Sequence, residues 1–506
     1  MARTDRVERH RVVIIGSGVG GSVAAFRLAE AGIANVVLER GRRWPITSRG
    51  GNFPALPSLD RRLVWLEGER HPRAPGPATP LSRFVDRITS IPRPRSTGLL
   101  DVLLHRNLTV MCGAGVGGGT LVYGGMLPQP MPEPFSRVFP GEIDYEELDQ
   151  VYYPRARRRM IAATFPEELL THTRYRSSRI WHSAAVASGL EAELVVGNYD
   201  FDAVRAELAG DRDAAITRGQ YAFTGCNSGA KMSVDRTYLA RAEATGMTEV
   251  RSLHRVTAVA QDREGRFRVR ADRLGTDGAT LQRVTLMTDR LILAAGGVHT
   301  PQLLVRARDT GALPDLNEHV GADWGTNGDQ IPLLMTPALP SWPGQAGPPA
   351  ALVRSRDGSA MVTHGPLPLP AGMMTCPGVG IPDRLGRWNY SGESGTVRLE
   401  WAAGSDATAR RTVGDLLRQI ARHIPAGACV IDPNAAHPLV LHPLGGAVIG
   451  KATDVHGRLH GYSGLYCLDS ALMPGCTPGV NPALTIAAIV ERCLDHLIGE
   501  FLAAGH

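Results

Sequence analysis

The sequence has few lysines, and this scarcity helps to exclude one class of partner. Lys231 and Lys451 are the only lysines among 55 basic residues, so the net charge of +6 comes almost wholly from arginine. Proteins that bind nucleic acid carry basic runs interleaved with aromatic residues, and no such run persists in this chain. We therefore interpret the arginine excess as a solvated surface and expect no nucleic-acid partner.

Paired cysteines are also missing. The seven cysteines are odd in number, lie far apart and form no CxxC pair; they are Cys112, Cys226, Cys376, Cys429, Cys467, Cys476 and Cys493. A disulfide framework needs an even set, and a zinc site usually needs closely spaced pairs. The sequence therefore predicts neither disulfides nor a bound metal.

Long apolar runs are the third absence. No run approaches the roughly 20 residues that a membrane-spanning helix needs. Residues 1–11, which precede the first apolar strand, contain no hydrophobic signal segment. We expect no transmembrane segment and a cytoplasmic protein. The composition of 43% apolar and 21% charged residues is typical of a globular protein, and 506 residues favour two domains.

The stretch from residue 12 to residue 40 has the order of a dinucleotide-binding unit. Val12–Ile15 predicts a buried strand, a glycine turn follows, and residues 22–31 predict a helix. A second strand is expected at Val36–Leu38, and it leads into Glu39. A glycine motif alone is weak evidence, but strand, turn, helix, strand and acid in this order indicate a dinucleotide site.

The glycines of this unit follow the GxGxxG spacing, and each has a physical task. Gly16 permits the tight turn, Gly18 lets backbone N–H groups approach a pyrophosphate, and Gly21 lets the helix pack close to the strand. Glu39 follows Gly21 by 18 residues, so we expect its carboxylate to accept hydrogen bonds from the adenosine ribose.

A second glycine cluster occupies residues 112–126, with seven glycines between Gly113 and Gly125. That density is incompatible with the interior of a helix or strand. A flexible linker would carry serine, whereas here Val116, Leu121 and Tyr123 separate the glycines. We predict a loop whose backbone passes close to a flat ligand.

Residue patterns in the rest of the chain predict only the approximate bounds of each element. The expected elements are, in order, extended loops at about 44–94, a helix at about 142–165, an antiparallel meander over 255–262, 267–274 and 283–289, a strand at 291–295, a helix after Pro301, a strand at 465–468 and a helix at 482–502. The strand at 291–295 is followed by Gly296-Gly297, which repeats the pattern of the first unit. It therefore predicts a return of the chain to the first sheet.

Two C-terminal residues are candidates for chemistry. Asn481 is expected to cap the final helix, whose N-terminus carries about half a positive charge. Such a terminus would stabilise the anion that forms on a flavin ring when hydride arrives. His442, in the segment LHPLGG, is suited to take the hydroxyl proton during alcohol oxidation.

The chain resembles the glucose-methanol-choline (GMC) family of FAD oxidoreductases, above all its steroid-oxidising members. The resemblance spans nearly the whole chain, through the blocks GSGVGG with Glu39, GAGVGGGTLVYGGM, VYYPRARRRM, VGNYDF, DRTYLARA, LLVRARDTGALPDLNEHVGADWGTNG, HPLGGAVIGKATD, GLYCLDSALMPG and GVNPALTIAA. It implies FAD held non-covalently, and a buried cavity for a bulky lipophilic alcohol.

The resemblance also implies roles for single residues. His442 matches the active-site histidine, and Asn481 matches the asparagine that contacts flavin and substrate oxygen. The positions expected to contact the cofactor are Gly16, Gly18, Gly21, Glu39, Gly115, Gly118, Gly119, Tyr123, Met126, Val256, Asp469, Asn481 and Pro482. Within this set Val256 matches a backbone position at the adenine, and Asp469 one near the ribityl chain.

The chain departs from the steroid oxidases in three places. Those enzymes use a glutamate to isomerise the steroid double bond, but the matching stretch, AMVTHGPLPLPAG, has no carboxylate. Thr363 and His364 lie nearest, and His364 is a candidate substitute base. Tyr123 replaces an asparagine of the flavin loop, and Ala483 replaces an aromatic residue after Asn481-Pro482. These changes indicate a remodelled cavity and a different substrate.

The sequence therefore predicts an α/β flavoprotein with a discontinuous Rossmann-like FAD-binding domain and an α+β substrate-binding domain over the flavin. The first comprises residues 8–46, 108–127, 228–316 and 455–506, and the second 47–107, 128–227 and 317–454. The expected reaction is oxidation of a hydroxyl group of a bulky hydrophobic alcohol by hydride transfer to FAD, with O2 or another acceptor reoxidising the flavin.

Two alternatives to alcohol oxidation remain open from the sequence. The same scaffold could use bound FAD for a non-redox or internally redox-neutral cyclisation, isomerisation or elimination of a hydrophobic natural product, because one fold supports many functions. The retained pair His442 and Asn481 disfavours this reading. A binding or membrane-surface protein with a vestigial flavin is the third reading, and it rests only on the arginine excess.

Overall fold

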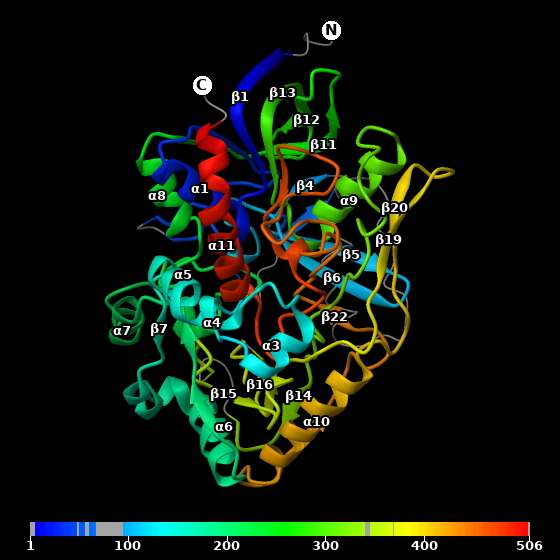
Figure 1. The fold of residues 1–506 in the computed structure, drawn as a ribbon. Coiled ribbons are helices and arrows are strands. Elements are labelled where there is room, and N and C mark those ends of the chain that lie inside the picture. Colours follow the sequence, from blue (N-terminus) through cyan, green and yellow to red (C-terminus); the bar gives the residue numbers. More distant parts are fainter. Residues whose placement is uncertain are drawn as a thin grey trace.

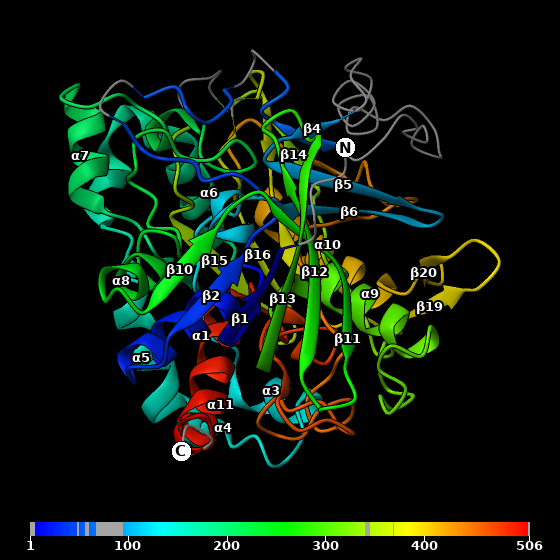
Figure 2. The ribbon, with the colours of Figure 1, turned by 90° about the horizontal axis from the view of Figure 1, so that it is seen from above.

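The computed structural model describes residues 6–47, 50–55, 60–66, 95–339, 345–367 and 369–503. Its largest sheet has seven strands, six of which lie in the order β10-β2-β1-β13-β12-β11 (Figures 1 and 2). Their bounds are Thr248–Arg251, Asn35–Leu38, Arg6–Ile15, Thr280–Leu293, Phe267–Leu274 and His254–Gln261; the seventh strand, β23 at Leu465–Cys467, pairs with β13. The mixed α/β architecture confirms the predicted fold class.

The parallel part of this sheet positions the site. Strands β10, β2, β1, β13 and β23 all run parallel to their neighbours. Their carboxyl ends therefore meet at one edge, where ligands of such sheets bind. Gly16 follows β1, Gly296 comes shortly after β13, and Asp469 follows β23, so three sequence-distant turns gather there.

Strand β13 corrects one prediction. The sequence suggested separate strands at 283–289 and 291–295, but the structure has one strand of 14 residues. It pairs antiparallel with β12 over residues 280–288, parallel with β1 over residues 284–293, and parallel with β23 over its last three residues. One continuous strand thus joins the meander, which was predicted correctly, to the parallel sheet.

Helices cover this sheet. Helix α1 (Val19–Glu30) packs against α8 (Tyr238–Ala244) and α11 (Ala483–Ala503), and the three lie together in Figure 1. Helix α9 (Gly296–Asp309) packs on β11 and begins before Pro301 rather than after it. Proline removes the helical N–H partner of the Gly297 carbonyl. The indole Nε1 of Trp324 donates to that oxygen instead, at 2.7 Å, which explains how the helix tolerates the proline.

The helix expected at 142–165 is shorter and irregular. It consists of α4 (Tyr145–Glu147), a π-helical turn η2 (Leu148–Tyr152) and α5 (Tyr153–Arg159). Pro154 lies in the first turn of α5, and a proline cannot donate the backbone bond of a regular helix at that point. A single continuous α-helix is therefore replaced by two pieces joined by a π turn.

A second core lies at the other end of the molecule, in the lower half of Figure 1. It is built between helices α6 (Arg176–Ala187) and α10 (Ala407–Ala421) and two small sheets. One sheet is β18-β16-β15-β8 (Gly378–Val379, Met361–Thr363, Ala351–Arg354, Ala192–Leu194), and the other is β17-β14-β21 (Met373–Thr375, Leu333–Met335, Cys429–Ile431). The exact domain boundaries stay a prediction.

A five-stranded sheet brings His442 close to the second glycine loop. Its order is β22-β6-β5-β3-β4, with bounds Leu439–Val440, Leu108–Gly113, Leu100–His105, Val64–Leu66 and Ser96–Thr97. Strand β22 runs parallel to β6. Because parallel strands end on the same side, His442 after β22 and the glycine loop after β6 emerge at neighbouring places.

The remaining elements are small. They are η1 (Gly118–Leu121), α3 (Pro132–Val138), β7 (Ala163–Thr164), η3 (Glu167–Thr171), η4 (Thr173–Tyr175), β9 (Val196–Gly197), α7 (Phe201–Ala209), η5 (Ile216–Arg218), β19 (Arg387–Ser391), β20 (Thr396–Glu400) and η6 (Ser470–Leu472). Much of the loop region predicted at 44–94 falls outside the described residues. Among the residues that are described, no helix has the length and apolar character needed to cross a membrane.

Candidate active site

A cavity of about 1170 Å³ extends from the carboxyl edge of the large sheet to the small sheets of the second core. At one end it is lined by the glycine turn after β1, and at the other by side chains of β14, β16 and β17. His442 and Asn481 both line it. The cavity therefore joins the predicted dinucleotide site to the predicted catalytic pair.

The dinucleotide end has the features that the motif requires. Gly16 has φ of +101°, and a Cβ there would clash with the carbonyl oxygen of Ala294. Gly18 is the N-cap of α1, and no described atom lies within 4 Å of a Cβ built on it. Within the described chain no side chain caps α1, so its first N–H groups face the cavity and suit an anionic pyrophosphate.

Two of the predicted glycines do not line the cavity. A Cβ on Gly21 would clash with the carbonyl oxygen of Gly16, so Gly21 serves the close packing of helix on strand. A Cβ on Gly115 would meet Leu121 at 2.7 Å and the Trp44 indole at 2.9 Å. Gly115 therefore shapes the loop from behind rather than facing the ligand space.

The other loop positions gather as the resemblance implied. Gly118, Gly119, Tyr123 and Met126 all line the cavity, and a Cβ on Gly118 would lie 2.7 Å from the Cα of Gly18. The two glycine segments thus lie side by side. Val256 and Pro482 complete the predicted set on the cavity wall.

The two predicted carboxylates accept hydrogen bonds from nearby backbone N–H and hydroxyl groups. Glu39 accepts hydrogen bonds from the Ser17 hydroxyl at 2.7 Å and from the Gly41 N–H at 2.8 Å. Asp469 accepts from Gly296 N–H at 2.7 Å, and burial raises the pKa of its carboxyl. Both residues line the cavity, so the ribose role of Glu39 and the ribityl role of Asp469 are compatible with their placement.

The catalytic candidates meet around one imidazole. Nδ1 of His442 lies 2.6 Å from Oδ1 of Asp329, and Nε2 lies 3.3 Å from Nδ2 of Asn481. Because a carboxylate only accepts, Nδ1 carries the proton and Nε2 presents its lone pair. This tautomer leaves the basic nitrogen beside Asn481 at the cavity wall.

Asn481 differs from the expected helix cap. Helix α11 begins at Ala483, two residues later, and the first intrahelical bond runs from Ile486 N–H to the Pro482 carbonyl. The side-chain oxygen of Asn481 is buried and has no hydrogen-bond partner among the described residues. An amide that caps a helix accepts a backbone N–H with its side-chain oxygen. The oxygen of Asn481 accepts none from the helix, so it remains available to a ligand.

His364 lies away from the cavity. It is fully buried, its Nε2 accepts the Ala350 N–H at 2.9 Å, and its ring packs 5.4 Å from that of Trp181. Burial lowers its pKa to about 3. The neighbouring Thr363 and Gly365 face the cavity instead, because side chains alternate along an extended segment. The proposed substitute base is therefore not brought to the site.

Asp329 is the residue that sequence reasoning missed. It is the last residue of the turn Thr326–Asp329, and its side chain is only 4% exposed. The residue comes directly after a block that carried the family resemblance, which ends at Gly328, and its 113-residue separation from His442 gave no local signal. The one signal that could have suggested Asp329 is that it is a carboxylate at a tight turn.

The far end of the cavity is apolar. Its wall includes Ile331, Leu333, Met361, Leu367, Leu369, Met373, Val379 and Leu441. Thr363 and Thr375 also line it, but their hydroxyls donate to backbone carbonyls of Ala351 and Gly365, each at 2.7 Å. This region therefore suits a hydrophobic ligand body.

Comparison with known proteins agrees with this geometry. Two GMC oxidoreductase family models match residues 11–308 and 416–489. A cholesterol oxidase of Mycobacterium tuberculosis is 28% identical over 95% of this chain and 90% of its own length.

Solved structures show the same fold at low sequence identity. A pyridoxine 4-oxidase from Mesorbium loti has a TM-score of 0.60 and 15% identity, covering 96% of this chain and 99% of its own. A fungal aryl-alcohol oxidase has a TM-score of 0.62 and 14% identity, covering 97% and 99%.

Proposed function

The chain belongs to the GMC oxidoreductase family, an FAD-dependent class that oxidises CH–OH groups, and we propose that its substrate is a bulky hydrophobic alcohol. The proposed product is the corresponding ketone or aldehyde, with O2 as the electron acceptor. The observation that carries the proposal is the imidazole Nε2 of His442, whose lone pair faces Asn481 at the wall of a largely apolar cavity.

The protein's own residues supply the proton chemistry. Nε2 of His442 accepts the hydroxyl proton as the C–O bond becomes a carbonyl, and Asn481 Nδ2 donates a hydrogen bond to the substrate oxygen. The N-terminus of α1, which lines the cavity, would neutralise part of the pyrophosphate charge. The chemistry that bound FAD would supply is acceptance of a hydride from the carbinol carbon, and O2 would then take up the two electrons and two protons to give H2O2.

The acceptor and the substrate class are supported by the relatives. The similar protein of Mycobacterium tuberculosis is a cholesterol oxidase, and both structural neighbours are also named oxidases. A sterol-sized body requires an extended apolar wall, which β14, β16 and β17 provide here.

The proposed reaction ends at the carbonyl. The described carboxylates that line the cavity are Glu39, Asp101, Asp329 and Asp469. All four are already engaged, by backbone or hydroxyl donors, by Arg40 or by His442. The strand β16 that faces the substrate space contributes Met361 and Thr363 instead. We therefore expect a steroid substrate to leave without a shift of its double bond.

The test is an absorbance spectrum followed by anaerobic titration. Purified protein should show a flavin spectrum, and cholesterol, 4-methoxybenzyl alcohol, 1-decanol and pyridoxine would be added separately without oxygen. Bleaching by a hydrophobic member, recovery in air and formation of H2O2 are expected. Flavin that none of these alcohols reduces would contradict the proposal, and recovery only with an artificial acceptor would replace the oxidase by a dehydrogenase.

A further inference from the structure

A single turn, Thr326–Asp329, holds both catalytic candidates. Asn327 has a left-handed φ of 57°, which asparagine tolerates better than most residues. Its side-chain oxygen accepts the Thr477 N–H at 2.8 Å, and its Nδ2 donates to the Val480 carbonyl at 2.9 Å. Asn327 therefore fixes the segment that leads directly into Asn481.

The last residue of the turn fixes His442. Oδ2 of Asp329 accepts the backbone N–H groups of Leu441 at 2.6 Å and of His442 at 2.8 Å. Oδ1 faces Nδ1 of the imidazole at 2.6 Å. One buried carboxylate thus determines both where the histidine backbone lies and which ring nitrogen carries the proton.

The turn is itself anchored to the second core. The Thr326 hydroxyl donates to Oδ1 of Asp406 at 2.7 Å, and it accepts the Gly328 N–H at 3.1 Å. Asp406 directly precedes α10, so the turn is tied to a helix that lies outside the large sheet. A turn held from three sides can keep Nε2 of His442 and the amide of Asn481 3.3 Å apart.

We propose that Asp329 is a positioning residue of the active site. It holds His442 as the Nδ1–H tautomer, so that the Nε2 lone pair faces the cavity, and its charge stabilises the imidazolium formed when the hydroxyl proton arrives. The inference rests on the proposed function, because it assigns Asp329 a part in the same alcohol oxidation.

The substitution Asp329→Asn separates tautomer control from shape. Two backbone N–H groups face the Oδ2 position, so the amide oxygen of the variant takes that place and its NH2 faces Nδ1. Nδ1 must then accept, and the ring proton moves to Nε2. A matched exchange in the serine protease triad lowers kcat about 10⁴-fold through the wrong tautomer.

The first experiment measures anaerobic flavin reduction by stopped flow, using whichever of the four named alcohols reduces the wild-type protein. We expect D329N to lower the limiting reduction rate by about 10³-fold or more with little change in the apparent Kd of the alcohol. D329E should recover part of the rate because it restores the charge. The control D323N removes the charge of a partly exposed carboxylate in the same segment, which pairs with Lys451, and the rate should stay within about twofold.

The second experiment reads the tautomer without turnover. Protein labelled with [15N]histidine would be compared by NMR with H442Q, which identifies the His442 resonances. Wild type should show the Nδ1–H form and D329N the Nε2–H form. Unchanged ring shifts in D329N would overturn the tautomer assignment, and an unchanged reduction rate would by itself overturn the positioning role.

The two proposals fail differently. If no alcohol reduces the wild-type flavin, the proposed function fails, whereas the tautomer comparison still tests the link between Asp329 and His442. If an alcohol reduces wild type and D329N equally well, the proposed function stands and the positioning role is wrong.

Discussion

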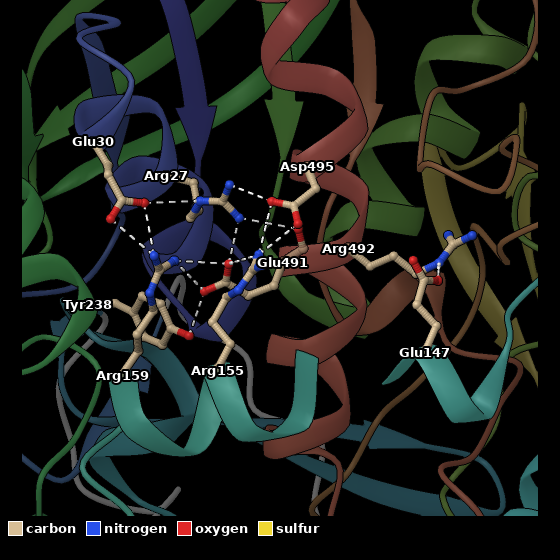
Figure 3. Close-up of polar contacts among 9 residues, drawn as sticks. All are labelled: Arg27, Glu30, Glu147, Arg155, Arg159, Tyr238, Glu491, Arg492 and Asp495. Carbon is tan, nitrogen blue, oxygen red and sulfur yellow. Dashed lines mark hydrogen bonds and ion pairs between the residues drawn. The ribbon is translucent and has the colours of Figure 1, made fainter. Parts of the chain in front are cut away.

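Two buried polar clusters lie along helix α11, and they are built in opposite ways. In the cluster around Glu491, which we call the saturated cluster, both carboxylate oxygens of Glu491 accept hydrogen bonds from protein side chains (Figure 3). Oε1 of Glu491 accepts from Arg159 at 2.8 Å and from Tyr238 at 2.9 Å, and Oε2 accepts from Arg27 at 2.6 Å. These partners come from α5, α8 and α1, so one fully buried carboxylate ties three helices to α11.

The cluster at the start of α11 is left incomplete. Asn481 has a buried side-chain oxygen without a partner among the described residues, and its contact with His442 is long, at 3.3 Å. Buried polar atoms are normally paired, so an unpaired one beside a cavity indicates a place kept for a ligand. The comparison separates polar groups that stabilise the fold from those that remain available for chemistry.

The largest effect is expected at the incomplete cluster. His442→Gln removes the basic nitrogen but keeps an amide that can donate to Asp329. We expect anaerobic flavin reduction to slow by about 10³–10⁴-fold, because general base catalysis is lost. The melting temperature should change by only a few degrees. A variant that reduces its flavin at the wild-type rate would remove His442 from the mechanism.

The saturated cluster should respond in the opposite way. Glu491→Gln removes the fully buried counter-charge of Arg27 and Arg159 and leaves them the partly exposed carboxylates of Asp495 and Glu30. Breaking a buried pair costs about 3–5 kcal/mol, which is the upper limit expected here. We expect a clear fall in the thermal unfolding midpoint, measured by circular dichroism, with an almost unchanged reduction rate in the folded protein.

Glu30 provides the control within the same cluster. Its carboxylate pairs with Arg159 but is 46% exposed, so Glu30→Gln should cost less than about 1 kcal/mol. Equal losses of stability in E30Q and E491Q would show that burial does not govern the cluster.

A smaller effect is expected for Asn481→Ala. The side chain contributes one long hydrogen bond and an unpaired oxygen, so its loss should leave stability within about 1 kcal/mol. The flavin reduction rate should fall by about 10²–10³-fold, as for one hydrogen-bond donor to the reacting oxygen. Stopped-flow reduction and calorimetry together measure the two quantities, and a large stability loss would make Asn481 a structural residue.

The smallest effect concerns Asp406 behind the catalytic turn. Burial, with a contribution from nearby Asp329, raises the pKa of its carboxyl to about 7. The folded protein then binds the proton more tightly than the unfolded chain, so stability should fall as pH rises from about 4 to 7 and level off above. Asp406→Asn should remove a fall of about 2–3 kcal/mol between pH 5 and pH 8, measured from the unfolding midpoints at the two pH values. A pH dependence equal to that of wild type would contradict this assignment.

The sequence by itself determined what depends on local geometry. The GxGxxG turn, its flanking strands and the meander need only neighbouring residues, because glycine conformation and apolar periodicity act over short distances. The strands at 12–15 and 36–38 and the three meander strands are all present. His442 and Asn481 were also singled out, although their joint role remains a proposal.

The tertiary structure alone decided what lies far apart in the chain. The parallel pairing of β22 with β6 carries His442 to the glycine loop, and the turn at Asp329 reaches it across 113 residues. No local pattern distinguishes Asp329 from an ordinary turn carboxylate, or places His364 on the far side of its strand. Hydrogen bonds between distant segments depend on the packing of the whole sheet, and their partners therefore appear only in the folded molecule.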